Sequence, residues 1–352
     1  MLLGLALGGT GWHPDDRRAS PPDPMDAGQL RRLALEAERG GLDLVTLDDS
    51  MAPVTAPSRG RADAVTALAA IAPVTRTVGL VAAVTTTYAE PFHVARALAT
   101  LDHISHGRAG WCPRVAASAA EAAHFGPESL AGIDQLRAEA AEFTEVVTAL
   151  WDSWQDDAVI RDTASGRFLD RAKVRPIDHV GPHFRIKGPA VVPRSPQGHP
   201  VLATRLGPRS PLTAVHGADL VFTEVRDARR VREQAGTEAR VIAEVEVHLD
   251  GDGAAARSER PDAAGRLRFT GSAAELAASL EAVSAREPVD GFHLRAAVLP
   301  GTVERLVQEV VPLLRRHRPV RPGTVGGSLR ERLGLPARVP NTFPVRKAAL
   351  AR

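Results

Sequence analysis

Apolar segments short enough to be single strands recur eight times along this chain, and stretches with helical periodicity separate most of them. The expected strands are residues 2–9, 42–47, 78–84, 109–112, 200–203, 219–223, 241–249 and 291–298. The expected helices are residues 26–39, 62–71, 91–101, 133–154, 211–216, 227–234, 272–285 and 303–316. This alternation predicts an α/β protein whose parallel strands close into a single (β/α)8 TIM barrel. An open, doubly wound sheet is the alternative, although no glycine-rich dinucleotide-binding fingerprint follows the first strand.

Two stretches interrupt the alternation. Residues 156–196 are rich in proline, glycine and charge, and we expect a surface excursion after strand four, with a hairpin as one option. Residues 250–268 are polar and rich in glycine and alanine, which predicts a loop near strand seven. We expect the barrel to occupy residues 1–318 and a C-terminal tail to occupy residues 319–352.

Composition excludes several classes of protein. All but three of the 44 basic residues are arginines, and they are interleaved with 42 acidic residues instead of clustering with aromatic residues as in a nucleic-acid groove. The single cysteine, Cys112, rules out a disulfide within the chain, and the scattered histidines give no metal-ligand spacing. The apolar start is interpreted as a strand and not as a signal peptide, and no apolar run reaches the roughly 18 residues of a membrane span. We therefore expect a soluble, cytoplasmic protein.

In a barrel, the residues that directly follow the strands converge on one face, where active sites lie. They are Trp12, His13, Asp49, residues 85–88, residues 111–114, residues 204–210, Glu224, His248 and Arg295. Large rings at Trp12, His13 and Trp111 would either wall a substrate pocket or pack on the barrel rim. Asp49 would either bind a ligand or cap the turn after strand two.

Further candidates carry polar chemistry. Thr85 begins a run of three threonines before Tyr88, and such hydroxyls supply the few placed donors of a pocket. Ser210 precedes a proline, as an N-cap does, and with Arg209 beside it the same helix end would bind an anion. Cys112 has no base partner in view, so we interpret it as pocket wall and not as a nucleophile.

The string TTTYAEPFHVARALATLDHISHGRAGW resembles the flavin-dependent, bacterial-luciferase-like monooxygenases, in the nitrilotriacetate and dibenzothiophene-sulfone monooxygenase branch. Further matching strings are GLALGGTGWH, EAERGGLDLVTLDDS, LWDSWQDDAVIRDTASGRF, IDHVGPHFRIKGPAVVPRSPQGHPV, VDGFHLRAAVLPGTVERLVQEVVPLL and LRERLGL, and together they span almost the whole chain. The resemblance implies a barrel that receives reduced FMN from a separate reductase and uses oxygen to oxygenate a small organic substrate. It also implies a homo-oligomer, with a deazaflavin as the alternative cofactor.

The resemblance carries over to single residues only in part. Asp49, Thr85 and Tyr88 match positions that contact the flavin in relatives. Cys112 stands where relatives have an asparagine facing the flavin, while Ile133 and Arg137 replace a histidine and a tyrosine.

The phosphate loop after strand five also departs from the family pattern, and the excursion near strand seven is shortened. Arg114, Arg137, Arg205 and Arg209 can replace the lost phosphate contacts, because arginine binds phosphate bidentately. Two hypotheses remain: an active flavin-dependent monooxygenase with a rearranged cofactor site, or a barrel without flavin chemistry that serves as a partner subunit or small-molecule binder.

Overall fold

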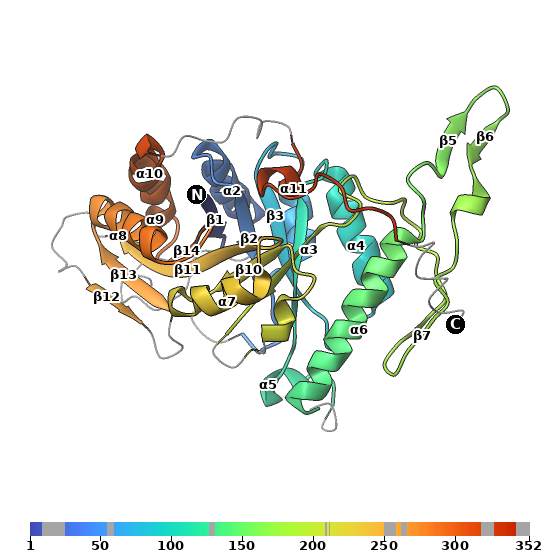
Figure 1. The fold of residues 1–352 in the computed structure, drawn as a ribbon, viewed down its shortest axis with the longest axis horizontal. Helices are drawn as coiled ribbons and strands as arrows, with labels where there is room; N and C mark the ends of the chain where they lie inside the picture. Colours follow the sequence, from blue (N-terminus) through green and yellow to red (C-terminus); the bar gives the residue numbers. More distant parts are fainter. Residues whose placement is uncertain are drawn as a thin grey trace.

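A closed ring of eight parallel strands forms the centre of the molecule (Figure 1). The computed structural model describes residues 1–8, 25–54, 60–126, 131–207, 210, 212–249, 258–261, 266–317 and 327–342. In ring order the strands are β10 (Leu220–Thr223), β9 (Val201–Arg205), β4 (Ala109–Arg114), β3 (Gly79–Thr85), β2 (Leu44–Leu47), β1 (Leu2–Ala6), β14 (Gly291–Ala296) and β11 (Arg240–Leu249). Pairing of β11 with β10 closes the ring. The predicted (β/α)8 barrel is therefore confirmed, and the open sheet is wrong.

Helices surround the ring on its outer side. They are α2 (Ala27–Arg39), α3 (Ala64–Ile71), α4 (Pro91–Ile104), α6 (Ile133–Asp152), α7 (Ala228–Ala235), α8 (Ala273–Arg286) and a last helix of three segments, α9 (Gly301–Arg305), the π-helical η4 (Leu306–Val310) and α10 (Val311–His317). The helix expected after strand five is only a short 3₁₀ turn, η2 (Leu212–Val215). Another 3₁₀ turn, η3 (Val225–Asp227), precedes α7.

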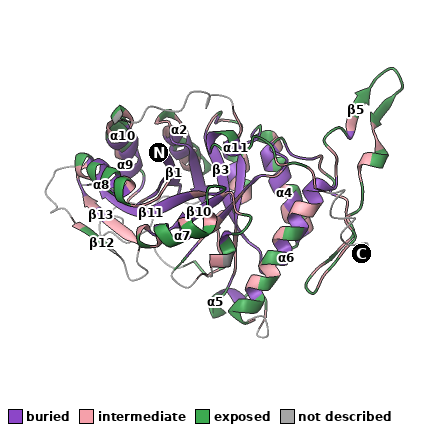
Figure 2. Ribbon diagram, in the orientation of Figure 1, coloured by how far each residue is buried: buried purple, intermediate pink, exposed green. Residues whose placement is uncertain are grey.

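Local signals explain where the helices begin. The Asp26 carboxylate accepts a hydrogen bond from the backbone N–H of Gln29 and caps α2. Ser272 and Glu275 form the expected capping box at the start of α8. Pro91 occupies the first turn of α4, where a missing N–H costs nothing. The strands are buried on both faces, which accounts for their continuous apolar sequences (Figure 2).

The excursion after β4 begins with a short helix, α5 (Ala119–Ala122), and α6. Beyond α6, β5 (Val159–Asp162) and β6 (Arg167–Leu169) form one antiparallel hairpin, and β7 (His179–Val180) and β8 (Arg185–Ile186) form a second. The 3₁₀ turn η1 (Arg171–Lys173) lies between the two hairpins. Figure 1 shows the β5–β6 hairpin projecting away from the barrel, and Figure 2 shows it largely exposed.

Strand seven has a different excursion from the one expected. Instead of a loop throughout, residues 258–261 form β12 (Ser258–Pro261) and residues 267–271 form β13 (Leu267–Gly271); residues 250–257 and 262–265 lie outside the described part. The reason is the length of β11, whose first half alone pairs with β10. β13 pairs with the remainder of β11, so the backbone N–H and C=O groups along that edge of β11 are hydrogen-bonded.

Part of the tail closes the amino end of the barrel. Helix α11 (Leu329–Arg332) places Leu329 in one apolar cluster with Leu44 and Leu220 from inside the ring. Arg330 binds both carboxylate oxygens of Asp219 at 2.7 Å. The expected boundary at residue 318 remains a prediction, because residues 318–326 lie outside the described part. None of the described helices combines the length and the apolar character that crossing a membrane requires.

Candidate active site

Alternation along the strands decides which side chains face the barrel interior. Leu44, Val201 and Phe222 belong to the interior apolar cluster, so residues an even number of positions away on the same strands also face inward. At the carboxyl ends of the strands other than β1, the inward positions are polar. They are Asp48, Thr85, Arg114, Arg205, Glu224, Glu246, His248 and Arg295. This end of the ring is called the mouth below, and it is the end where barrel enzymes place their chemistry.

Asp48 joins two arginines across the mouth. Its Oδ1 lies 2.8 Å from Nη1 of Arg205, and its Oδ2 lies 2.9 Å from Nη1 of Arg295. Burial alone would raise the pKa of Asp48, but the two guanidinium groups hold it far below its usual range. Asp48 is therefore a carboxylate at every pH at which the protein is handled.

Glu244 and His293 lie beneath these residues. Glu244 Oε1 is 3.1 Å from Nε of Arg205 and 3.1 Å from Nδ1 of His293, while His293 Nε2 is 2.9 Å from the hydroxyl of Thr46. Burial would raise the pKa of Glu244, but Arg205 and His293 lower it to about 2. Burial lowers the pKa of His293, so the ring is neutral. Asp48, Arg205, Glu244, His293 and Arg295 are called the floor cluster.

Arg114 is held at the end of β4, between β9 and β3. Its Nη1 donates to Glu121 Oε1 at 2.6 Å and to the hydroxyl of Thr85 at 3.3 Å. Ser50 and Ser118 also donate to the Glu121 carboxylate. Against the effect of burial, these hydrogen bonds lower the pKa of Glu121 to about 2. The guanidinium expected to replace a phosphate contact is thus already ion-paired.

Asp49 does not share the environment of Asp48. It follows Asp48 in the chain and therefore faces the other side of the strand end, where its carboxylate accepts from the backbone N–H of Ser50 at 2.6 Å and of Ala64, at the start of α3, at 3.3 Å. Of the two roles considered for Asp49, the contacts are those of a cap. Its pKa is raised, mainly by burial.

Trp111 and Cys112 also separate by alternation. Trp111 is fully buried and packs edge-to-face on Trp151 of α6, at 6.1 Å between ring centroids. It lies in the outer core between strand and helix, so the expectation that it walls the pocket is wrong. Cys112 faces the interior with the apolar cluster. Burial raises the pKa of its thiol to about 11, which leaves it protonated and unsuited to nucleophilic chemistry.

Tyr88 stands at the rim in an unusual backbone conformation. Its φ is 65°, which is rare for a bulky residue. Its ring stacks on Phe125 at 4.0 Å between centroids. A strained residue that carries an aromatic ring at a barrel mouth is typical of a functional position.

The remaining candidates are spread over other elements. Arg137 lies on α6 and pairs with Asp134 at 3.2 Å. The Ser210 hydroxyl accepts from the backbone N–H of Gly207 at 3.0 Å and closes a turn after β9. Trp12, His13 and Arg209 lie outside the described residues. Among the described residues, no group of three or more His, Cys, Asp and Glu side chains is arranged to hold a metal ion.

Sequence reasoning missed several residues of this mouth. Thr46, Asp48, Glu121, Glu244, Glu246 and His293 were not among the candidates. Glu244 and His293 each stand between apolar neighbours on a buried strand, which is the signal that could have found them. Glu121 stands three residues after Ser118, in a capping box.

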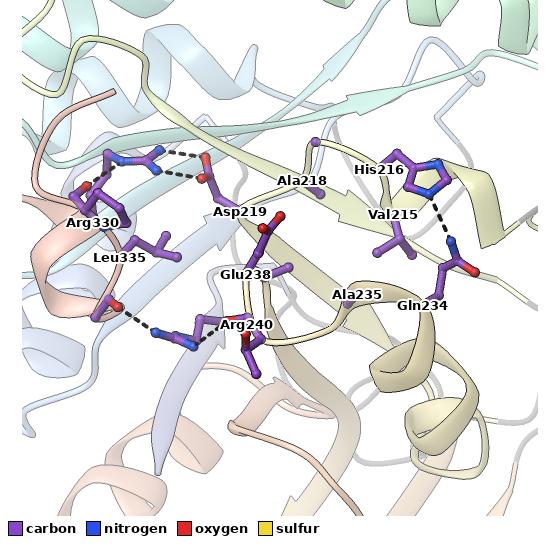
Figure 3. A pocket seen from close by; sticks show the side chains of 15 residues that line it. Val215, His216, Ala218, Asp219, Gln234, Ala235, Glu238, Arg240, Arg330 and Leu335 are labelled. Carbon is purple, nitrogen blue, oxygen red and sulfur yellow. Dashed lines mark hydrogen bonds and ion pairs between the residues drawn. The ribbon is translucent and has the colours of Figure 1, made fainter. Parts of the chain in front are cut away.

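A hollow of about 500 Å³ lies at the other end of the barrel (Figure 3). It is bordered by the starts of β10 and β11 and by the tail after α11. Asp219 there is bound by Arg330, and Arg240 donates to the carbonyl oxygens of Leu333 and Gly334, so these charged groups hold the tail in place. Since this is the amino end of the ring, the hollow is not the candidate active site.

Comparison with known proteins agrees with the barrel fold. The sequence pattern of luciferase-like monooxygenases matches residues 10–311. Nitrilotriacetate monooxygenase component A of Aminobacter aminovorans is 40% identical over 222 residues, which cover 58% of this chain and 49% of that protein. One of the subunits of pristinamycin IIA synthase from Streptomyces pristinaespiralis is 35% identical over 310 residues, 88% of this chain and 89% of that one.

A solved structure extends the comparison. Riboflavin lyase with modified FMN and substrate riboflavin has a TM-score of 0.82 and 23% identity, and the alignment covers 99% of each chain. The chain spans about half the length of the first curated relatives it matches. The expected resemblance to the nitrilotriacetate and dibenzothiophene-sulfone branch is confirmed. The chain belongs to the luciferase-like monooxygenase family.

Proposed function

We propose that this chain is a flavin-dependent monooxygenase that uses reduced FMN from a separate flavin reductase, and oxygen, to oxygenate a small organic substrate. The observation that carries the proposal is the polar mouth of a luciferase-like barrel, where hydroxyl and guanidinium donors meet at the carboxyl ends of the strands. In such enzymes the cofactor supplies the oxygen chemistry, and the protein positions it and excludes water.

The donor set fits a flavin. The polar edge of the flavin ring and its phosphate are rich in hydrogen-bond acceptors, and Thr85, Arg114 and Ser210 offer hydroxyl and guanidinium donors near the mouth. Tyr88, stacked on Phe125, supplies an aromatic surface for a flat ring. Cys112 offers a protonated, apolar wall that cannot compete as a nucleophile. Arg209 and Arg137 stay in the proposed set as phosphate ligands, and Trp12 and His13 as pocket walls.

None of these residues would react with the substrate; each would orient or hold a group at the mouth. Thr85 and Tyr88 would orient the ring, and Arg114, already fixed by Glu121, would present a rigid donor. Glu121 is ionised, so it holds Arg114 and does not supply a proton at neutral pH. The neutral His293 beneath the mouth is tied to Glu244 and Thr46 and supports the floor.

The test is a titration of the purified chain with reduced FMN without oxygen, repeated with oxidised FMN and with a deazaflavin. We expect reduced FMN to bind, and Thr85→Ala to weaken binding about fivefold, because one hydrogen bond contributes about 1 kcal/mol. Thr100→Ala is the matched control, because its hydroxyl binds the Arg96 carbonyl on the outer helix α4. Failure of all three cofactors to bind near millimolar concentration would contradict the proposal.

A second candidate function is a partner subunit without flavin chemistry of its own. The observation that favours it is the near end-to-end match to a relative whose name marks it as one subunit of a synthase. It predicts no flavin binding by the chain alone, so the same titration separates the two functions. Preference for the deazaflavin would instead identify a deazaflavin-dependent oxidoreductase.

The setting in the cell is part of the proposal. A lone buried thiol suits a reducing compartment, so we place the protein in the cytoplasm, and we propose that it forms a homo-oligomer. Light scattering on the purified chain measures the latter, and a monomer would contradict it.

A further inference from the structure

Two arginines of the floor cluster have more hydrogen-bond donors than their partners use. Each guanidinium carries five N–H donors. Arg205 and Arg295 each bind Asp48 through Nη1, and Glu244 is their other carboxylate neighbour among the described residues. The Nε of Arg205 lies 3.1 Å from Glu244 Oε1, and the Nε of Arg295 is buried and makes no hydrogen bond in the described part of the chain. Asp48 and Glu244 therefore engage only part of these N–H donors, and donors on the solvent side of the two groups remain for a further acceptor.

The two guanidinium groups contact buried residues on the interior side and are partly exposed on the side of the mouth. Glu244 is buried under them, and Arg205 also lies over the Phe222 ring at 5.4 Å from its centroid. The side chains of Arg205 and Arg295 are nevertheless 29% and 14% exposed. Their accessible atoms are therefore on the solvent side, at the end of the barrel where a substrate would enter.

Asp48 shows what this pair of guanidinium groups can hold. Arg205 belongs to β9 and Arg295 to β14, two strands that are not neighbours in the ring. One carboxylate nevertheless bridges them, with one oxygen on each guanidinium group. The two groups are thus spaced to share a single carboxylate, and their unused donors can receive a second.

We propose that Arg205 and Arg295 bind a carboxylate group of the substrate, with Asp48 and Glu244 as positioning residues. This inference rests on the proposed monooxygenase function and deepens it, because it names small organic acids as the substrate class. An apolar substrate over this floor would leave guanidinium donors buried without acceptors.

The test measures carboxylate binding with no flavin present. Calorimetry at constant ionic strength compares succinate with succinamide, which has the same shape without the charge. We expect the native chain to prefer succinate, and Arg295→Gln to weaken succinate binding at least tenfold, as for a lost charge-assisted hydrogen bond. Arg295→Lys should give an intermediate loss, because it keeps the charge without the planar fork.

Arg232→Gln is the matched control. Arg232 has an exposure of 23%, close to that of Arg205, and pairs with Asp290 at the amino end of the barrel. Its removal breaks a comparable ion pair far from the mouth, so succinate binding should not change. Arg295→Lys also controls for a folding defect in Arg295→Gln, because the lysine keeps the positive charge that balances Asp48 and Glu244.

Three results would overturn the inference. The native chain could bind succinate no better than succinamide, or Arg295→Gln could leave the preference unchanged. Third, Arg295→Gln could weaken FMN but neither riboflavin nor succinate, which would make these arginines a cofactor phosphate site. If the native chain binds no flavin but still prefers succinate, only the proposed monooxygenase function is contradicted. The failure of that function and the failure of the carboxylate site are therefore distinguishable.

Discussion

His293 and Glu244 face each other across neighbouring strands inside the barrel, with Nδ1 of the ring 3.1 Å from Oε1 of the carboxylate. Because a carboxylate only accepts, Nδ1 carries the proton, and the unprotonated Nε2 accepts from the Thr46 hydroxyl. Gly4 makes room for this arrangement, since a Cβ there would lie 3.1 Å from the His293 ring. The imidazole is thus fixed in one tautomer under the mouth.

Glu244→Gln should destabilise the protein by about 3 kcal/mol. The change removes Glu244, the more buried of the two counter-charges of Arg205, and breaking one partner of a buried ion pair costs about 3–5 kcal/mol. Urea unfolding followed by circular dichroism measures the loss. Glu309→Gln serves as the control, because Glu309 pairs with Arg305 on the surface and should cost less than about 1 kcal/mol. Equal losses for the two variants would mean that Glu244 is not a buried anchor.

Acid should weaken the native chain more than the Glu121→Gln variant. The folded pKa of Glu121 is about 2, below its ordinary value of 4.5, so its contribution is fully present above pH 4.5 and is lost as the pH falls toward 2. A shift of this size corresponds to about 3 kcal/mol. Unfolding free energies at pH 6 and pH 3 should therefore differ less in the variant. The idea fails if both proteins show the same pH dependence.

The arrangement of the barrel was predictable because its signal is local. The strands are mostly apolar, most helices have one apolar face, and Ser272 with Glu275 marks a helix start within four residues. The strand β13 was missed because its reason is not local: it forms to cover the part of β11 that extends beyond β10. The tail segment around Leu329 was missed for the same reason, since its burial depends on the hollow end of the ring.

The mouth was predictable in place but not in detail. The residues after the strands do converge there, and Thr85 and Arg295 were among the candidates. Alternation from the buried Leu44 places Asp48 on the inner side of the strand end and Asp49 on the other side, and only Asp49 was among the candidates. The pairing of Asp48 with Arg205 joins residues 157 positions apart in the sequence, and no local pattern reveals such a contact.

Asp152→Ala should cost about 3–5 kcal/mol and loosen the C-terminal segment. The buried Asp152 accepts from Arg194 at 2.9 Å, His199 at 2.7 Å and the Thr342 hydroxyl at 2.6 Å, so it joins α6, the excursion and the tail. Urea unfolding and limited proteolysis report the two effects. Asp156→Ala is the control, since Asp156 binds the same Arg194 but is far more exposed, and it should cost less than about 1 kcal/mol. Unchanged proteolysis in Asp152→Ala would argue against a joining role.

Gly181→Ala and Glu142→Gln should not be additive. The Glu142 carboxylate accepts from His179 Nε2 at 2.9 Å and from the backbone N–H groups of His183 and Phe184, which fixes the β7–β8 hairpin on α6. A Cβ on Gly181 would lie 1.9 Å from Glu142 Oε1, so the alanine must displace the carboxylate that the glutamine also disables.

Each single change should cost about 2 kcal/mol, and the double variant clearly less than the sum, because both break the same set of hydrogen bonds. Unfolding free energies of the four proteins give the coupling directly. Gly301→Ala is the control, since a Cβ there has nothing within 4 Å, and it should change stability little in either background. Additive losses for Gly181→Ala and Glu142→Gln would show that the hairpin is held by other contacts, because two changes that disable one carboxylate cannot each remove its full contribution.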